Sequence, residues 1–164
     1  MQRPVTKVLF VSASNACRSL LAEACLQHLG QGKFKVFSCG VPDLIADTPD
    51  NWTLLALKTA SIPAVNLKCK GWSEFTRNGA PRMDFVIALD AGTLDLHPPW
   101  PGQPVTALWD YPSLDSNANK RGNGAAVMHI LMSLRRRIEL LVSLHSRSKK
   151  HSDLVHDLQD MSHI

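Results

Sequence analysis

The segment from Ser12 to Ser19 carries residue types that could bind an anion. An apolar stretch typical of a strand, Val8–Val11, ends at Ser12, and an amphipathic helical pattern begins at Arg18. A turn of small residues between a strand and a helix directs several backbone N–H groups at one point, and the helix start adds partial positive charge. Arg18 adds a planar, permanently charged guanidinium that suits tetrahedral oxyanions. The segment therefore predicts a binding loop for phosphate, arsenate or sulfate, formed by Ser12, Ala13, Ser14, Asn15, Ala16, Cys17, Arg18 and Ser19.

Strands and helices must alternate to hold this loop. Apolar runs predict four strands, at residues 5–11, 33–38, 84–89 and 105–109. Apolar residues at helical spacing predict helices at 18–29 and around 127–142, with one short helical turn at 72–75. A further helix is predicted to start within residues 47–50, with Pro49 early in its first turn, and to run to about Ala60. The first strand, helix and second strand form a βαβ unit with a right-handed crossover. The alternation as a whole predicts an open α/β sheet.

Three polar residues follow predicted strands. Ligands of open α/β sheets bind beyond the carboxyl ends of the strands. Ser12, Asp90 and Asp110 each occupy such a position. We therefore expect the anion loop and two acids at one rim of the sheet, with Asp110 as a possible general acid. Residues 90–98, which follow the third strand, are expected to form a loop.

Length and composition favour a single soluble domain. The 164 residues are enough to bury a core, and we expect one α/β domain over residues 1–148, followed by a basic tail or a short extra helix over 149–164. No apolar stretch could span a bilayer and no signal-peptide pattern is seen, so we expect a cytoplasmic protein without a membrane partner.

The charged and metal-ligating residues point to few other partners. The formal charge is +4, with basic clusters at 135–137 and 147–150. Neither cluster is interleaved with aromatic residues, so no nucleic-acid partner is expected, and residues 135–137 are expected on a solvated helix face. The four cysteines and seven histidines lack metal-ligand spacing, so no metal and no cofactor are expected.

The loop resembles the phosphate-binding loop of the low-molecular-weight protein tyrosine phosphatases and of the thioredoxin-coupled arsenate reductases that share their fold. Their loop consists of a cysteine, five residues, then arginine and serine, and Asn15, Cys17, Arg18 and Ser19 match it. The resemblance implies a three-layer α/β sandwich, with a four-stranded parallel sheet and helices on both faces, and hydrolysis of phosphate monoesters of the phosphotyrosine type. Further similar segments cover most of the chain: Ser38–Gly40, Lys68–Phe75, Phe85–Asp90, Trp100–Trp109 and Leu134–Leu144, the last two looking specifically like the arsenate-reductase branch.

The residue that should be the nucleophile departs from this pattern. Ser12 stands where the family has cysteine, six residues before Arg18. A cysteine works there because the loop N–H groups and the arginine lower the thiol pKa, so that a thiolate exists at neutral pH. A serine hydroxyl is far less acidic and needs an adjacent base, and the loop contains no histidine or lysine. Oxyanion binding should survive this change and phosphoryl transfer should not; the serine fits either an engineered substitution or a natural gene.

Two other catalytic positions also depart. The family's general acid is an Asp-Pro aspartate after the fourth strand, and that position falls at Ser113; Asp110 or Asp115 could replace it only if the loop shifts. Residues 90–98 lack the cysteine pair of the reductases, so a disulfide relay there is impossible. Two hypotheses follow: a phosphatase- or reductase-like oxyanion-binding protein that would be active only with cysteine at residue 12, or a non-catalytic regulator that binds an oxyanion or a phosphorylated protein.

Overall fold

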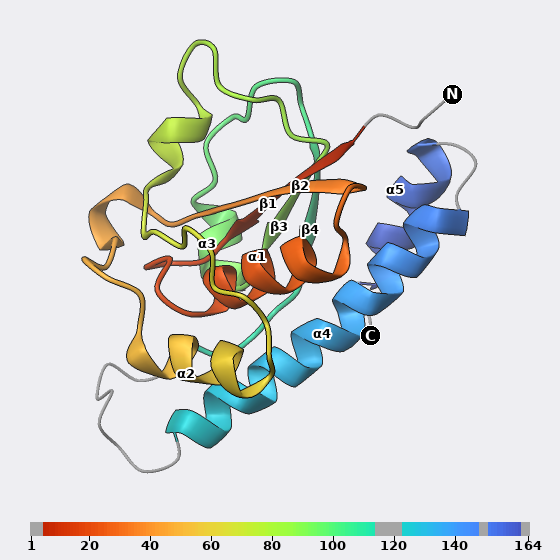
Figure 1. Cartoon of the computed structure of the whole chain (residues 1–164). Coiled ribbons are helices and arrows are strands. Elements are labelled where there is room, and N and C mark those ends of the chain that lie inside the picture. The colour runs from red at the N-terminus through yellow and green to blue at the C-terminus, as the bar shows by residue number, and fades with distance from the viewer. Residues whose placement is uncertain (1–4, 114–122, 148–150, 162–164) are drawn as a thin grey trace.

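The fold is built around a parallel sheet of four short strands. The computed structural model describes residues 5–113, 123–147 and 151–161. Strands β1 (Thr6–Val11), β2 (Phe34–Cys39), β3 (Phe85–Ala88) and β4 (Val105–Leu108) lie in the order β2-β1-β3-β4 (Figure 1). All neighbouring strands pair in parallel. The predicted strands are confirmed within one or two residues at each end, and the α/β fold class is confirmed.

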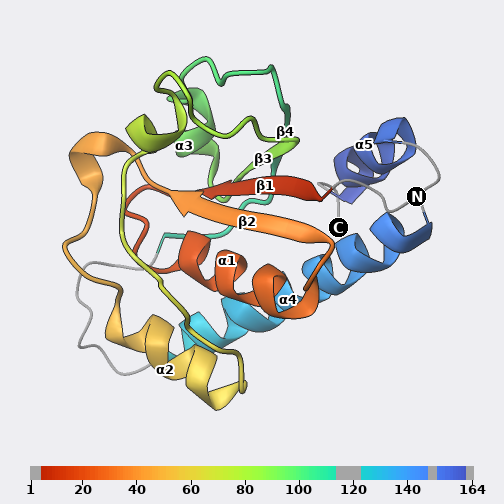
Figure 2. The same ribbon diagram turned by 45° about the horizontal axis from the view of Figure 1, so that its top comes forward.

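The central strand β1 has apolar side chains on both sides, so a core forms on each face of the sheet. Val8 and Phe10 belong to one buried cluster, and Leu9 and Val11 to another. The first cluster packs against α1 (Arg18–Leu29), α2 (Asn51–Thr59), α4 (Asn123–Arg147) and α5 (His151–Asp160). The second face is covered by a thinner layer with η2 (Trp72–Phe75) and α3 (Ala91–Asp95), so helices lie on both faces (Figure 2).

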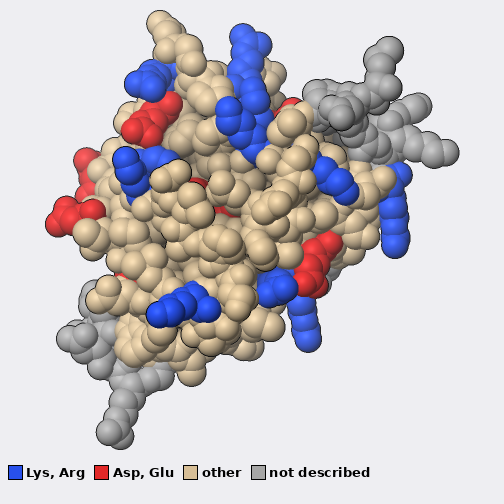
Figure 3. Space-filling view, in the orientation of Figure 1, with Lys and Arg blue, Asp and Glu red and all other residues tan. Residues whose placement is uncertain are grey.

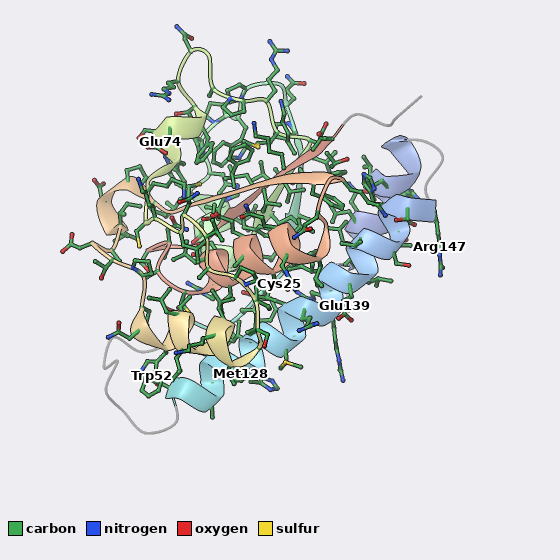
Figure 4. The ribbon with its side chains drawn as sticks, in the orientation of Figure 1. Cys25, Trp52, Glu74, Met128, Glu139 and Arg147 are labelled. Carbon is green, nitrogen blue, oxygen red and sulfur yellow. The ribbon has the colours of Figure 1, made fainter. Side chains whose placement is uncertain are left out.

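Helix α4 presents a continuous apolar stripe to this core. The stripe repeats at helical spacing, as the sequence predicts, and consists of Val127, Ile130, Leu131, Leu134, Ile138 and Leu141. On α1, Cys25 belongs to the same core and lies on the side toward α4 (Figure 4). Leu154 and Leu158 of helix α5 and Met161 directly after it, each at most 3% exposed, join the core. The chain after α4 therefore contains a helix that packs on the α/β core.

Two short helices were not predicted from the sequence. The expected loop at residues 90–98 contains α3, so that expectation was wrong for its first half. Asp90 begins α3 as its N-cap, because its carboxylate accepts a hydrogen bond from the Thr93 N–H at 2.6 Å. A 3₁₀ turn, η1 (Pro42–Leu44), follows β2. Most of the loop expected between Asp110 and Asn123 lies outside the described residues.

The surface offers no large charged feature on the side shown in Figure 3. Lys and Arg side chains are scattered there among uncharged residues and do not form a continuous stripe. Among the described residues, no helix has both the length and the apolar character needed to cross a membrane.

Candidate anion-binding site

The loop between β1 and α1 occupies the point where the sheet reverses its winding. Strand β1 pairs with β2 on one side and with β3 on the other. Connections leave such a point in opposite directions, which opens a crevice at the carboxyl ends of the two central strands. The loop that follows β1 (residues 12–17, the β1–α1 loop) and Asp90 after β3 both lie at this end, as the sequence predicts.

Three carbonyl groups of the β1–α1 loop are bonded to the segment that follows β2. Oxygens of Ala13, Ser14 and Ala16 accept hydrogen bonds from the backbone N–H groups of residues 41, 46 and 50, at 2.9–3.1 Å. By contrast, none of the hydrogen bonds within the described residues uses a backbone N–H of residues 13–19 as donor. The loop is thus held from outside through its acceptors and keeps its donors available. Such donors at a helix start can bind an anion.

Asn15 fixes the loop from within. Its φ of 54° is in the left-handed region, which asparagine tolerates better than most residues. The side-chain amide is buried: Nδ2 donates to Ser19 Oγ at 2.6 Å and to Ser38 Oγ at 3.0 Å, and Oδ1 accepts from the Lys70 N–H at 3.0 Å. Both amide donors and one acceptor position of Oδ1 are thereby used. Asn15 therefore holds the shape of the loop from its buried side.

Gly40, at the end of β2, lets the loop approach the sheet closely. A Cβ atom at this position would lie 2.8 Å from the Ala13 carbonyl oxygen and 3.0 Å from the Asn15 backbone nitrogen. Both atoms are backbone and cannot move aside independently. Only glycine fits here, which gives a physical reason for its place in the Ser38–Gly40 segment.

Arg18 is buried at the first position of α1 and is held on one side only. Its side chain is 7% exposed. One terminal nitrogen, Nη1, donates to the Tyr111 carbonyl oxygen at 3.0 Å and lies 3.1 Å from Asp90 Oδ2. No hydrogen bond or ion pair in the described part of the chain uses Nε or Nη2. The guanidinium is therefore neutralised and oriented by one edge, while its Nε–Nη2 edge can bind an oxyanion through two donors.

Ser12 lies at the base of the loop, where the family pattern has the nucleophile. It is 2% exposed, and its Oγ is 2.6 Å from Ser19 Oγ. Ser19 is a hydroxyl and not a base, and Ser12 Oγ makes no other hydrogen bond among the described residues. The hydroxyl therefore lies at the base of the loop with no proton acceptor beside it that could activate it as a nucleophile.

A buried carboxyl group ends the polar network below the loop. Ser38 Oγ donates a short hydrogen bond to Glu23 Oε1, and the Lys70 ammonium lies 3.9 Å from the same oxygen. Burial raises the pKa of Glu23, and the Ser38 bond and the Lys70 charge offset part of that rise. Sequence reasoning missed Glu23, although a lone acid within the otherwise apolar stretch Leu20–Leu26 was a signal.

Asp110 is not joined to the loop by any contact that the structure describes. The residue is exposed, and its side chain makes no hydrogen bond or ion pair with the described residues. The loop after β4 reaches Arg18 instead through the backbone carbonyl of Tyr111, which sequence reasoning missed. Ser113 is exposed as well, and Asp115 lies outside the described residues.

Cys17 belongs to the packing side of the loop. Burial raises the pKa of its thiol, and nearby Asp50 adds to the rise, whereas the Thr53 hydroxyl and the Arg18 charge lower it. The thiol is therefore mainly protonated at neutral pH. Within the described residues, no group of three or more His, Cys, Asp or Glu side chains is placed to hold a metal ion.

Comparison with known proteins identifies the family. The sequence model described as "Low molecular weight phosphotyrosine protein phosphatase" matches residues 7–119. The chain belongs to this family. A glutaredoxin arsenate reductase of Synechocystis sp. is 28% identical over 114 residues, which are 68% of this chain and 81% of that protein.

Solved structures share the fold at lower identity. A Corynebacterium glutamicum thioredoxin-dependent arsenate reductase superposes with a TM-score of 0.66 at 23% identity, over 91% of this chain and 66% of that one. This chain thus spans about two thirds of that reductase. A cysteine-to-serine mutant of the YwlE arginine phosphatase, described as having a phosphorylated active-site serine, superposes with a TM-score of 0.68 at 17% identity, over 89% of this chain and 99% of that one.

Proposed function

We propose that the β1–α1 loop and Arg18 bind a phosphate-type oxyanion, and that this chain, with Ser12, does not hydrolyse phosphate monoesters. One observation carries the binding half of the proposal: the backbone N–H groups of residues 13–19 and the Nε–Nη2 edge of Arg18 make no hydrogen bond among the described residues, while the carbonyls of Ala13, Ser14 and Ala16 are bonded elsewhere. Phosphate, arsenate and sulfate all match this set of donors, because each presents several oxygens around a tetrahedral centre.

The inactive half of the proposal rests on Ser12 and on the loop after β4. Hydrolysis in this family, as the resemblance implies, would require attack by residue 12 on phosphorus and protonation of the leaving oxygen. Among the described residues, the Ser12 hydroxyl is hydrogen-bonded only to Ser19, and the Asp110 side chain makes no hydrogen bond or ion pair with the loop. With cysteine at residue 12 the loop would lower the thiol pKa, and the chain would hydrolyse aryl phosphates of the phosphotyrosine type, whose leaving oxygen needs little protonation.

The YwlE mutant carries a phosphoryl group on its active-site serine. This supports the proposal that a loop with serine at the nucleophile position can hold a phosphoryl group. The oxygen–phosphorus bond of a phosphoserine breaks less readily than a sulfur–phosphorus bond, because an alkoxide is a poorer leaving group than a thiolate. A chain of this kind would therefore bind or retain phosphate rather than turn it over.

The second candidate is a non-catalytic regulator that recognises a phosphorylated protein. The observation that favours it is a loop whose shape is held by hydrogen bonds, while the residue at the nucleophile position has no base beside it.

Intact mass measurement after incubation with an aryl phosphate separates the two candidate functions. A covalent phosphoryl group on Ser12 supports the enzyme-derived reading, and unmodified protein that still binds a phosphotyrosine peptide supports the regulator. A cytoplasmic location remains part of either proposal.

Sulfate-dependent thermal stabilisation tests the binding proposal. Sulfate should raise the melting temperature of the wild type, because a ligand that binds only the folded state stabilises it. Arg18→Ala should lose this rise. Arg136→Ala is the matched control, because it removes the same charge from an exposed position of α4 and should keep the rise. Equal stabilisation of the wild type and Arg18→Ala would overturn the proposal.

A further inference from the structure

Tyr111, the single tyrosine of the sequence, is fixed by four contacts. Its N–H donates to the Leu89 carbonyl at 2.9 Å, and its own carbonyl accepts from Arg18 at 3.0 Å. Its hydroxyl lies 2.9 Å from Ser133 Oγ, and its ring faces the Arg137 guanidinium at 5.1 Å. The first two contacts belong to the sheet and the site, and the last two come from α4. Tyr111 therefore joins the long C-terminal helix to the arginine of the candidate site.

The sequence predicts that residues 135–137 lie on a solvated helix face. For Arg137 this prediction was wrong. Its guanidinium lies over the ring of the fully buried Trp109 at 5.7 Å as well as over Tyr111. A planar guanidinium against two aromatic faces is a favourable cation–π arrangement, and partial burial strengthens it. The neighbouring Arg135 instead forms an exposed pair with Glu139 at 3.1 Å. The three consecutive arginines thus differ, and one of them packs behind the site.

We propose that Arg137 is a positioning residue for Arg18 and acts through Tyr111. Nη1 of Arg18 is held between Asp90 and the Tyr111 carbonyl, so the direction of the remaining Nε–Nη2 edge depends on both. Arg137 holds the Tyr111 ring, and the peptide that carries the carbonyl moves with it. This inference rests on the proposed function for its effect on anion binding, and it makes α4 part of the structure that sets anion affinity.

A phosphate titration followed on the single tyrosine tests the proposal. Protein labelled with ¹³C at tyrosine Cζ gives one signal, and inorganic phosphate should shift it in the wild type. Arg137→Ala should weaken phosphate binding about fivefold, which corresponds to one partly buried cation–π contact. Arg137→Lys should weaken it less, because the ammonium keeps the charge but not the planar stack. Arg136→Ala, the exposed neighbour, should bind as the wild type does.

A second readout does not depend on phosphate. The Nε–H signal of Arg18, assigned by its loss in Arg18→Lys, should move in Arg137→Ala without any ligand. If Arg137 only stabilises the fold, Arg137→Ala melts at a lower temperature but keeps the Arg18 signal and the wild-type phosphate affinity, and the proposal is wrong. If the wild type binds no phosphate, the proposed function fails, and the Arg18 signal still decides the positioning role. If Arg137→Ala does not fold, Arg137→Lys and Ser133→Ala replace it, each with a smaller expected shift.

Discussion

The loop after β1 and the loop after β4 leave the sheet at the same rim, yet they are held in different ways. In the β1–α1 loop the carbonyls, the Asn15 amide and the approach over Gly40 are all part of the packed structure. In the loop after β4, the Tyr111 backbone is held, while Asp110 and Ser113 are exposed. The loop that would bind an anion is thus held by contacts that also stabilise the fold. The side chains that could transfer a proton, after β4, are not held by such contacts.

This difference explains how the proposed anion-binding loop can keep its structure with serine at residue 12. Buried polar groups must be hydrogen-bonded, so a change at Asn15 costs stability whether or not a reaction takes place. A change from cysteine to serine at residue 12 leaves these contacts in place, because Ser12 needs only its bond to Ser19. Stability alone would therefore preserve the loop.

Asn15→Ala should cause the largest loss of stability. It removes three side-chain hydrogen bonds, leaves their partners buried, and places alanine at a positive φ. We expect a loss of about 3–4 kcal/mol in the free energy of unfolding, measured by chemical denaturation. Asn15→Gly should lose about 1 kcal/mol less, because glycine tolerates that φ. Two variants within about 1 kcal/mol of the wild type would show that the network does not hold the loop.

Gly40→Ala should be the next most severe change. The new Cβ would lie 2.8 Å and 3.0 Å from two backbone atoms, so the loop must shift. We expect a loss of about 1–3 kcal/mol together with the loss of sulfate-dependent stabilisation. Gly92→Ala is the control: its Cβ would approach only Asp90 Oδ1, at 3.5 Å, inside α3. Unchanged sulfate stabilisation in Gly40→Ala would contradict the close approach of the loop to the sheet.

Glu23→Gln should change how stability depends on pH. Burial raises the pKa of Glu23 in the folded state, so the folded protein holds this proton more tightly than the unfolded chain does. That contribution to stability is complete below the unfolded pKa, about 4.3, and is lost as pH rises through the raised folded pKa. The free energy of unfolding of Glu23→Gln, minus that of the wild type, should therefore increase as pH rises through this window. A difference that is constant with pH would contradict a raised Glu23 pKa.

Asp110→Asn should have the smallest effect. The residue is exposed and its side chain makes no hydrogen bond or ion pair with the described residues, so we expect a change in stability within about 0.5 kcal/mol. Phosphate affinity, measured by calorimetric titration, should match that of the wild type. A marked loss of affinity in Asp110→Asn would place this carboxylate in the binding site and remove the contrast between the two loops.

Much of the fold could be predicted because its signals are local. Uninterrupted apolar runs mark the strands, and the helical spacing of α4 marks the face that becomes buried. Helix α3 was missed because five residues are too short to show a period, and the Asp90 cap with Thr93 was its only sign. Short elements of this kind are set by a single cap and by the packing around them.

Site residues could be predicted where their types recur at a known spacing in the sequence. They could not be predicted where a backbone group makes the contact. Asn15 and Arg18 were expected from the loop pattern. The carbonyl of Tyr111 carries no residue-type signature, so its bond to Arg18 could not be read from the sequence. Arg137 looked solvated because only the fold brings the rings of the β4 loop under α4.

The central claim is that binding and chemistry are separate in this loop, and Ser12→Cys tests it most directly. Phosphate affinity and hydrolysis of an aryl phosphate should be measured on the wild type and on Ser12→Cys under the same conditions. We predict phosphate binding by both proteins and measurable hydrolysis only by Ser12→Cys. Hydrolysis by the wild type, or phosphate binding that appears only in Ser12→Cys, would contradict the account. Binding by both without hydrolysis by either would remove the enzyme-derived reading and leave the regulator.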